Sequence, residues 1–252
     1  MIKRSFQKAV QIHSEQPLSQ SGIFTEQEIE PLPEPVRHHL KAAGYIGKPK
    51  PARVTAYMRS VPLKDSNDKP PMIVDYTLCS YAYEPVRLAY IKTSVFGLPF
   101  EAFDSTQGGV GFMKGVIAKA FTLFNETGPE MDKAQLMTYL GECFLLPTSI
   151  IGGFITWEPI DGNSAKATIS YRGISGSGIF TFSDTGFVRS FYTDERARIG
   201  KGGEIDYPGW SVVYEDFREK AGIYTPKRAK TIWHEKDGDL VYFDASDISI
   251  VY

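Results

Sequence analysis

The chain has few cysteines, no excess of either charge and no long apolar run. Its two cysteines, Cys79 and Cys143, are too few for a disulfide framework, and we expect reduced, buried thiols. The 28 basic and 30 acidic residues are scattered, which argues against a nucleic-acid partner. The longest weakly polar run, residues 144–155, contains Pro147 and falls short of the roughly 20 apolar residues that cross a membrane. We therefore expect no membrane span.

Several motifs with defined chemistry are also missing. Of the four histidines, His38 and His39 are adjacent on a predicted helix and point apart, while His13 and His234 stand alone. With no HExxH motif and no paired cysteines, we expect no metal. No phosphate-binding glycine loop is present, and we expect no cofactor. The first sixteen residues lack the apolar region of a secretory signal, so the expected location is cytoplasmic.

What the sequence does contain is a long series of short runs rich in β-branched and aromatic residues. The connections IDGN, SDTG and KDGD are typical of hairpins, because glycine accepts the positive φ of tight turns. Residues 115–125 fit either a helix or a strand, and the Phe, Thr and Ile content of their second half favours a strand. The other predicted strands are Arg53–Ser60, Met72–Tyr83, Val86–Val95, Leu98–Asp104, Ile155–Pro159, Ala165–Tyr171, Ser177–Phe182, Phe187–Asp194, Trp210–Phe217, Ala229–Glu235, Leu240–Phe243 and Ile248–Tyr252.

Two segments have helix signals. In residues 25–44, Thr25 can form a capping box with Glu28, and Val36, Leu40 and Ala43 share one face. In residues 127–149, Asp132 can cap a helix with Gln135, and the apolar positions recur at helical spacing until Pro147 ends it. The apolar stripe of this second helix consists of Leu136, Tyr139, Leu140, Cys143 and Phe144. Glu142 lies roughly 130° from the stripe centre, at about 100° per residue, and should leave the core.

Together these patterns predict an α+β fold. A dozen short strands must curl, close or split, because strongly twisted open sheets rarely exceed roughly ten strands. We predict a large curved antiparallel β-sheet, open or a half barrel, with a few helices packed on its concave side. Residues 25–252 would form this single domain, and residues 1–24 would form an N-terminal arm or helix lying on it.

Nine further segments form an ordered pattern along the chain: LPEPVRHHLKAAG, GFMKGVIAKAF, TGPEMDKAQLMTYLGECFLLPTS, ITWEPIDGNSAKATI, FTFSDTGFV, DER, YPGWSVVYEDF, GIYTPKRAKTIW and ISIVY. In this order they resemble a bacterial family of unknown function, DUF6544 (also DUF6920). This resemblance implies a curved antiparallel sheet similar in outline to bacterial lipoprotein-carrier folds that hold apolar ligands, and it implies no reaction. The chain departs from the family in lacking a hydrophobic start and in having Phe144, Leu145 and Leu146 where relatives tend to have Trp.

Two carboxylates are candidate acids or bases. Glu142 is part of the motif that resembles the family, and burial beside a concave sheet would raise its pKa. Its alternative is a solvated helix face. Asp104 ends a predicted strand before Gly108 and Gly109, where sites are often built, and its alternative is a turn-capping role. Arg196, at another strand end, could bind a ligand carboxylate or pair with Glu142, or lie in solvent.

The chain is rich in aromatic residues, many at alternate strand positions. Most must fill the core, but a curved sheet could leave an apolar cavity between them. The leading hypothesis is a protein that binds an apolar or amphipathic small molecule there, with Glu142 and Arg196 orienting its polar end. The predicted contact residues are Tyr139, Trp157, Trp210, Tyr214 and Trp233.

Two other hypotheses stay open. One is a cofactor-independent isomerase, cyclase or hydrolase in which Glu142 or Asp104 moves a proton. The other is a structural protein with a filled interior. The oligomeric state is left open by the sequence.

Overall fold

The computed structural model describes residues 1–16, 22–200 and 202–252. Its main feature is one 14-stranded antiparallel sheet, accompanied by a small two-stranded sheet, β11–β12. The strands are β1 Arg53–Leu63, β2 Met72–Tyr81, β3 Val86–Val95, β4 Leu98–Gln107, β5 Val110–Ile117, β6 Phe121–Glu126, β7 Ile155–Asp161, β8 Ser164–Tyr171, β9 Ile174–Phe182, β10 Val188–Thr193, β11 Arg198–Ile199, β12 Ile205–Asp206, β13 Gly209–Lys220, β14 Ile223–Glu235, β15 Gly238–Ala245 and β16 Ile248–Val251. The helices are α1 Ile2–Ser14, α2 Glu26–Ile29, α3 Glu34–Ala42 and α4 Pro129–Gly141, followed by short 3₁₀ turns at Cys143–Leu145 and Pro147–Ile151.

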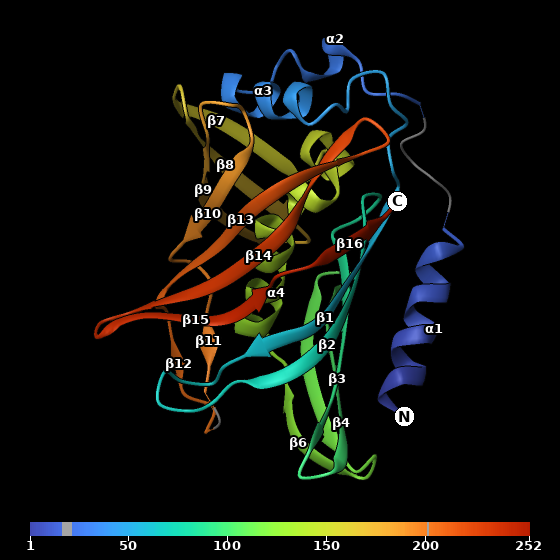
Figure 1. Cartoon of the computed structure of the whole chain (residues 1–252), viewed down its shortest axis with the longest axis vertical. Helices are drawn as coiled ribbons and strands as arrows, with labels where there is room; N and C mark the ends of the chain where they lie inside the picture. Colours follow the sequence, from blue (N-terminus) through green and yellow to red (C-terminus); the bar gives the residue numbers. More distant parts are fainter. Residues whose placement is uncertain (17–21, 201) are drawn as a thin grey trace.

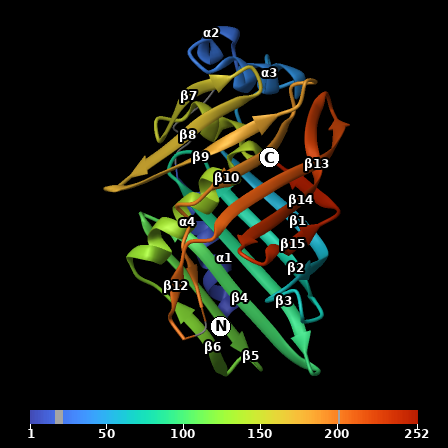
Figure 2. The same cartoon turned by 90° about the vertical axis from the view of Figure 1, so that its left-hand side faces the viewer.

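The sheet consists of two meanders joined at β1. One runs from β6 back to β1, and the other follows the order β15-β14-β13-β10-β9-β8-β7. The first half of β1 pairs with β16, and Leu63 at its end pairs with Phe243 of β15. Figures 1 and 2 show the two halves curving around α4. Among the described strands β6 and β7 are edges, so the predicted large, open antiparallel sheet is confirmed.

Two expectations about strands need correction. Residues 115–125 are indeed extended, but they hold two strands, the end of β5 and most of β6, joined by a turn in which Ala118 and Lys119 have positive φ. Strand β9 begins at Ile174, three residues before the predicted start at Ser177, so Gly176 lies inside it. A Cβ on Gly176 would come 2.4 Å from the Met137 sulfur of α4, so this glycine allows the helix to approach the sheet.

Helix α4 fills the concave side of the sheet. It begins at Pro129, three residues before the predicted cap, and Asp132 instead accepts a hydrogen bond from the backbone N–H of Gly111 at 2.7 Å. A Cβ on Gly111 would lie 2.5 Å from the Met131 carbonyl oxygen, so glycine is required where β5 meets the helix. From Ala134 to Gly141 every residue is buried. Over its last two turns the helix therefore has no solvated face.

Helix α3 and its C-cap contribute Val36, Leu40 and Ala43 to the same core as α4, whereas α1 packs on the opposite face of the sheet. Ile2, Phe6 and Ala9 of α1 pack on the outer face of the sheet, against a cluster that includes Leu88 and Phe103. Residues 17–21 of the predicted arm lie outside the described residues. Helices α2 and α3 cover the end of the sheet near β7 and β8 (Figure 1). The predicted Thr25–Glu28 capping box and the buried face of α3 are both confirmed.

A buried histidine anchors α3. His39 is 2% exposed, and its Nδ1 accepts a hydrogen bond from the backbone N–H of Val188 at 3.1 Å. The rings of Phe144, Phe187 and Phe217 surround the imidazole. Burial in this aromatic environment lowers the pKa of His39 to about 3. His39 is therefore neutral in the folded chain.

This burial predicts acid sensitivity. The pKa of His39 is about 3 in the folded chain and 6.5 in the unfolded chain, where the ring is in water. As the pH falls from 6.5 toward about 3, only the unfolded chain takes up a proton at this residue. The contribution of neutral His39 to folding stability is therefore fully present above pH 6.5 and decreases as the pH falls from 6.5 toward about 3. Between about pH 6 and about pH 4.5, His39 should contribute a loss of about 2 kcal/mol. Urea unfolding of wild type and His39→Asn at both pH values measures this difference, and parallel pH profiles would contradict it.

Candidate functional site

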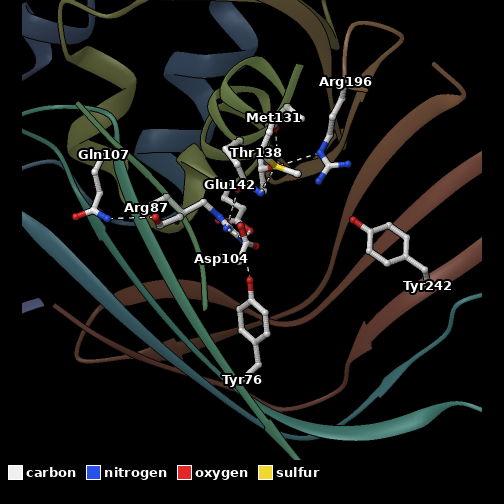
Figure 3. Close-up of polar contacts among 12 residues, drawn as sticks. Tyr76, Arg87, Asp104, Gln107, Met131, Thr138, Glu142, Arg196 and Tyr242 are labelled. Atoms are coloured by element: carbon white, nitrogen blue, oxygen red, sulfur yellow. Dashed lines mark hydrogen bonds and ion pairs between the residues drawn. The ribbon is translucent and has the colours of Figure 1, made fainter. Parts of the chain in front are cut away.

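A buried arginine organises the polar part of the concave face. Arg87 of β3 is 2% exposed, and its Nε and Nη2 donate to the two carboxylate oxygens of Glu142 at 2.7 and 2.9 Å. Its Nη1 donates to Asp104 Oδ2 at 2.9 Å, and Nη2 also donates to the Tyr76 hydroxyl at 2.6 Å. Figure 3 shows these side chains converging from β2, β3, β4 and the end of α4. The guanidinium is fully engaged by groups of the chain itself.

Glu142 does not leave the core as the helical wheel predicted. Its side chain is 16% exposed because α4 ends at Gly141 and the next residue turns toward the sheet, out of the helical series. Burial lowers the pKa of Arg87, but the opposing charges of Glu142 and Asp104 outweigh it and hold the pKa above its ordinary value. The pair with Arg196 is not formed. Glu142 is therefore a partner in a buried ion pair.

Asp104 lies in the middle of β4, because the strand continues to Gln107 instead of ending at Asp104. Its Oδ2 pairs with Arg87, whereas its Oδ1 is buried without a hydrogen-bond partner among the described residues. The hydroxyl of Thr106, two residues further on the same face, is likewise unpartnered. Buried polar atoms are normally hydrogen-bonded, so the Asp104 oxygen is available as an acceptor and the Thr106 hydroxyl as a donor or acceptor.

A second acid lies in the same row of the sheet. Asp104 pairs with Met113 of β5, and Met113 pairs with Glu126 of β6, which places all three side chains on the concave face. Burial, followed by the negative charge of Asp104, raises the pKa of Glu126. Arg87 is one positive group paired with two acids, Asp104 and Glu142, so this end of the concave face has more negative than positive groups.

Arg196 lies on the other side of the concavity from this cluster, near Tyr242 (Figure 3). Its Nε donates to the Thr138 hydroxyl of α4 at 2.9 Å, and its guanidinium lies 4.7 and 4.8 Å from the ring centres of Trp210 and Trp233. These rings stabilise the cation. Neither Nη atom has a hydrogen-bond partner among the described residues.

Below α4 the concave face is apolar. Six half-buried side chains from five strands pack against the main core there and keep part of their surface exposed. We call this set the apolar strip; it consists of Met72, Val95, Met113, Ile117, Phe124 and Phe243. One end of the strip reaches the row of Asp104 and Glu126, since Met113 belongs to both.

Four of the five predicted contact aromatics lie in the core. Tyr139 donates its hydroxyl proton to the Tyr81 carbonyl oxygen at 2.9 Å, and Tyr214 donates to the Gly141 carbonyl oxygen. Trp210 is fully buried and donates to the Tyr242 hydroxyl at 3.0 Å, and Trp233 stacks on the same tyrosine. Only Trp157 is half-buried. Their role as ligand contacts stays a prediction.

His234 is not isolated, contrary to the sequence analysis. Its Nε2 is 2.8 Å from the Ser211 hydroxyl, and its Nδ1 is 2.8 Å from Asp239 Oδ1, an order resembling a catalytic triad. Ser211 is buried, however, and β13 is paired on both sides, by β10 and β14. Those ladders occupy the backbone N–H groups that would stabilise an oxyanion. The geometry favours a structural role.

Hollows and other features lie away from this region. Two hollows of about 300 and 320 Å³ are lined by Pro62, Lys64, Arg228, Lys230, Val241 and Asp244, and by Tyr45, Pro49, Pro51, Ile223 and Tyr252. Neither contains a predicted site residue. Within the described ranges, no three His, Cys, Asp or Glu side chains are grouped to hold a metal ion. None of the described helices has the length and apolarity that a membrane crossing needs.

The described residues thus define an open, curved antiparallel sheet around a buried helix, with a polar cluster at its centre. The chain belongs to the family of unknown function DUF6544, which matches residues 22–245, so the predicted membership is confirmed. It is similar to the crystal structure of a LolA superfamily protein from Nitrosomonas europaea, with a TM-score of 0.40 and 14% identity over 84% of this chain and 90% of that one. Among curated proteins nothing matches.

Proposed function

We propose that the protein binds an amphipathic small molecule on the concave face of its sheet. The apolar body of the ligand lies along the apolar strip, and its polar end donates a hydrogen bond to Asp104. The observation that carries this proposal is the buried, unpartnered Oδ1 of Asp104, which is held at the end of the strip by Arg87. A donor from a ligand would satisfy it.

The charges around Asp104 select the polar end. Arg87 bonds both oxygens of Glu142, so the unpartnered oxygen of Asp104 is the stronger acceptor for the ligand, and the role of Glu142 in orienting it stays a prediction. The surplus of acids, with Glu126 in the same row, favours an ammonium or hydroxyl group and disfavours a carboxylate. Arg196 keeps its predicted place as a contact for a second polar group, since its Nη atoms are free of described partners.

Isothermal titration with dodecylammonium, dodecanol and dodecanoate tests this choice. We expect one dodecylammonium per chain and at least tenfold weaker binding of dodecanoate. Asp104→Asn keeps an acceptor for Arg87 but removes the charge, and it should weaken dodecylammonium binding by about tenfold, or about 1.4 kcal/mol. Glu101→Gln is the matched control, because Glu101 lies on the outer face of the same strand, bonded to Tyr90. Dodecanoate binding as tightly as dodecylammonium would overturn the proposal.

The same free oxygen also supports the second hypothesis, a cofactor-independent enzyme. A carboxylate oxygen beside a bound substrate can accept a proton from it. In that case Asp104→Asn would abolish turnover while an uncharged substrate still binds. Glu142→Gln would affect folding more than turnover, because its carboxylate is held by Arg87.

The cytoplasmic location stays part of this proposal. Both cysteines are free thiols, as expected in a reducing compartment. Cell fractionation followed by immunoblotting tests it, and recovery of the protein outside the cytoplasmic fraction would contradict it.

A further inference from the structure

Two neighbouring hairpin turns at one end of the sheet carry exposed apolar side chains. Phe96, in the turn between β3 and β4, is 100% exposed, and Leu98 beside it is 48% exposed. In the hairpin β5–β6, whose turn lies at the same end, Phe121 and Leu123 at the start of β6 are 69% and 57% exposed. Both turns lie at the lower end of the molecule in Figures 1 and 2. We call these four residues the apolar tip.

The two turns form one unit. The backbone N–H of Ala118, in the second turn, donates to the carbonyl oxygen of Pro99, next to the first turn, at 2.8 Å. Immediately above, Phe100 pairs with Ile117 across β4 and β5. The ladder therefore fixes the tip side chains relative to one another, and they belong to a rigid end of the sheet.

Phe96 contributes nothing to the folded chain that would explain its presence. It has φ of 50° and is followed by Gly97 with φ of 78°. A two-residue turn with positive φ at both positions favours Asn-Gly, and an aromatic residue there is strained. Because the ring is fully exposed, no packing within the chain offsets this cost. A contact between Phe96 and another molecule would offset this cost.

The charges at the tip indicate the kind of partner. Residues 93–100 and 115–125 contain one charged side chain, Lys119, which is exposed at the second turn. Neither stretch has an acid. Aromatic and aliphatic side chains beside a lysine match the boundary between anionic headgroups and acyl chains. Four side chains on two turns offer far less than the roughly 800 Å² that each partner buries in a stable protein interface.

We propose that the apolar tip docks on an anionic lipid surface, with Phe96 and Phe121 inserted and Lys119 at the headgroups. The tip adjoins the apolar strip, because Phe121 pairs with Ile117. Docking would therefore bring the open end of the strip to the lipid. The inference does not depend on the proposed ligand.

Vesicle flotation tests this docking. Wild type should float with vesicles of three parts phosphatidylcholine to one part phosphatidylglycerol, and far less with phosphatidylcholine alone. The double variant Phe96→Ser, Phe121→Ser should lose at least tenfold in bound fraction, and Lys119→Glu should lose severalfold. Ile160→Ser, an exposed apolar residue of β7, is the control that should bind like wild type. Circular dichroism and urea unfolding check that each variant folds.

Three outcomes would overturn the proposal. Wild type could stay unbound by both kinds of vesicle, or the double variant could float as well as wild type. Alternatively, sedimentation could show a wild-type dimer that the double variant loses, which would make the tip a contact between two copies of the chain. Loss of vesicle binding in the double variant, with its dodecylammonium affinity unchanged, would separate docking from the ligand site.

Discussion

Arg87→Met should destabilise the fold by about 3–5 kcal/mol, because it leaves Glu142 and Asp104 as buried charges without their partner. The Tyr76 hydroxyl would lose its donor as well. Urea unfolding at neutral pH measures the loss. Arg228→Met is the matched control: Arg228 also pairs with a carboxylate, Asp244, but its side chain is 39% exposed, so the cost should stay below about 1 kcal/mol.

A double variant separates the ion pair from simple packing. In Arg87→Met combined with Glu142→Met, the charge left behind by the single change is gone. We expect this chain to recover about 1–3 kcal/mol of the loss. Two results would contradict the role of the cluster in holding α4 to β3. Arg87→Met and Arg228→Met could lower the free energy of unfolding by the same amount, or the double variant could be no more stable than Arg87→Met.

Trp210→Ala should cost about 3–5 kcal/mol of stability, as expected for a fully buried tryptophan. Its ring contacts Phe191 and Trp233, its Nε1 donates to Tyr242, and Arg196 lies over its face. Removing it opens a cavity at the centre of the larger meander. Chemical unfolding measures the cost.

Trp157→Ala provides the comparison, because Trp157 is half-buried and packs on Phe144 and Phe180 at the border of the core. Its loss should be clearly smaller than that of Trp210→Ala. A ligand-contact role predicts another pattern: Trp210→Ala would fold with nearly wild-type stability and lose dodecylammonium binding. That result would support Trp210 as a ligand contact and contradict its assignment to the core.

Local chemistry made much of the fold predictable. The Thr25–Glu28 capping box and the buried face of α3 depend on residues three or four positions apart. The hairpins depend on turn glycines such as Gly186 and Gly238, which have positive φ in the structure. Packing between residues far apart in the sequence was harder to predict. The helical wheel failed for Glu142 because residues 134–141 of α4 are all buried, so the end of the helix has no solvated face to which a charge could point.

The centre of the site was missed for a related reason. Arg87 lies within a strand that was correctly predicted, but nothing in its neighbourhood shows which face of that strand meets α4. Its one signal was a lone charge in the apolar run VRLAYI. The partners Tyr76, Asp104 and Glu142 come from three other elements, and only the curvature of the sheet brings them together. Exposed Phe96 likewise gave no periodic pattern to detect.

The central claim, that a ligand lies along the apolar strip and ends at Asp104, can be tested directly by methyl NMR. The chain has six methionines, and two of them, Met72 and Met113, belong to the strip. With ¹³C-methyl methionine, dodecylammonium should shift both signals strongly, and Asp104→Asn should weaken the concentration dependence of the Met113 shift. The Met1 signal, next to α1 on the outer face, should stay in place. Shifts confined to Met1, or an unmoved Met113 signal at saturating ligand, would contradict the account.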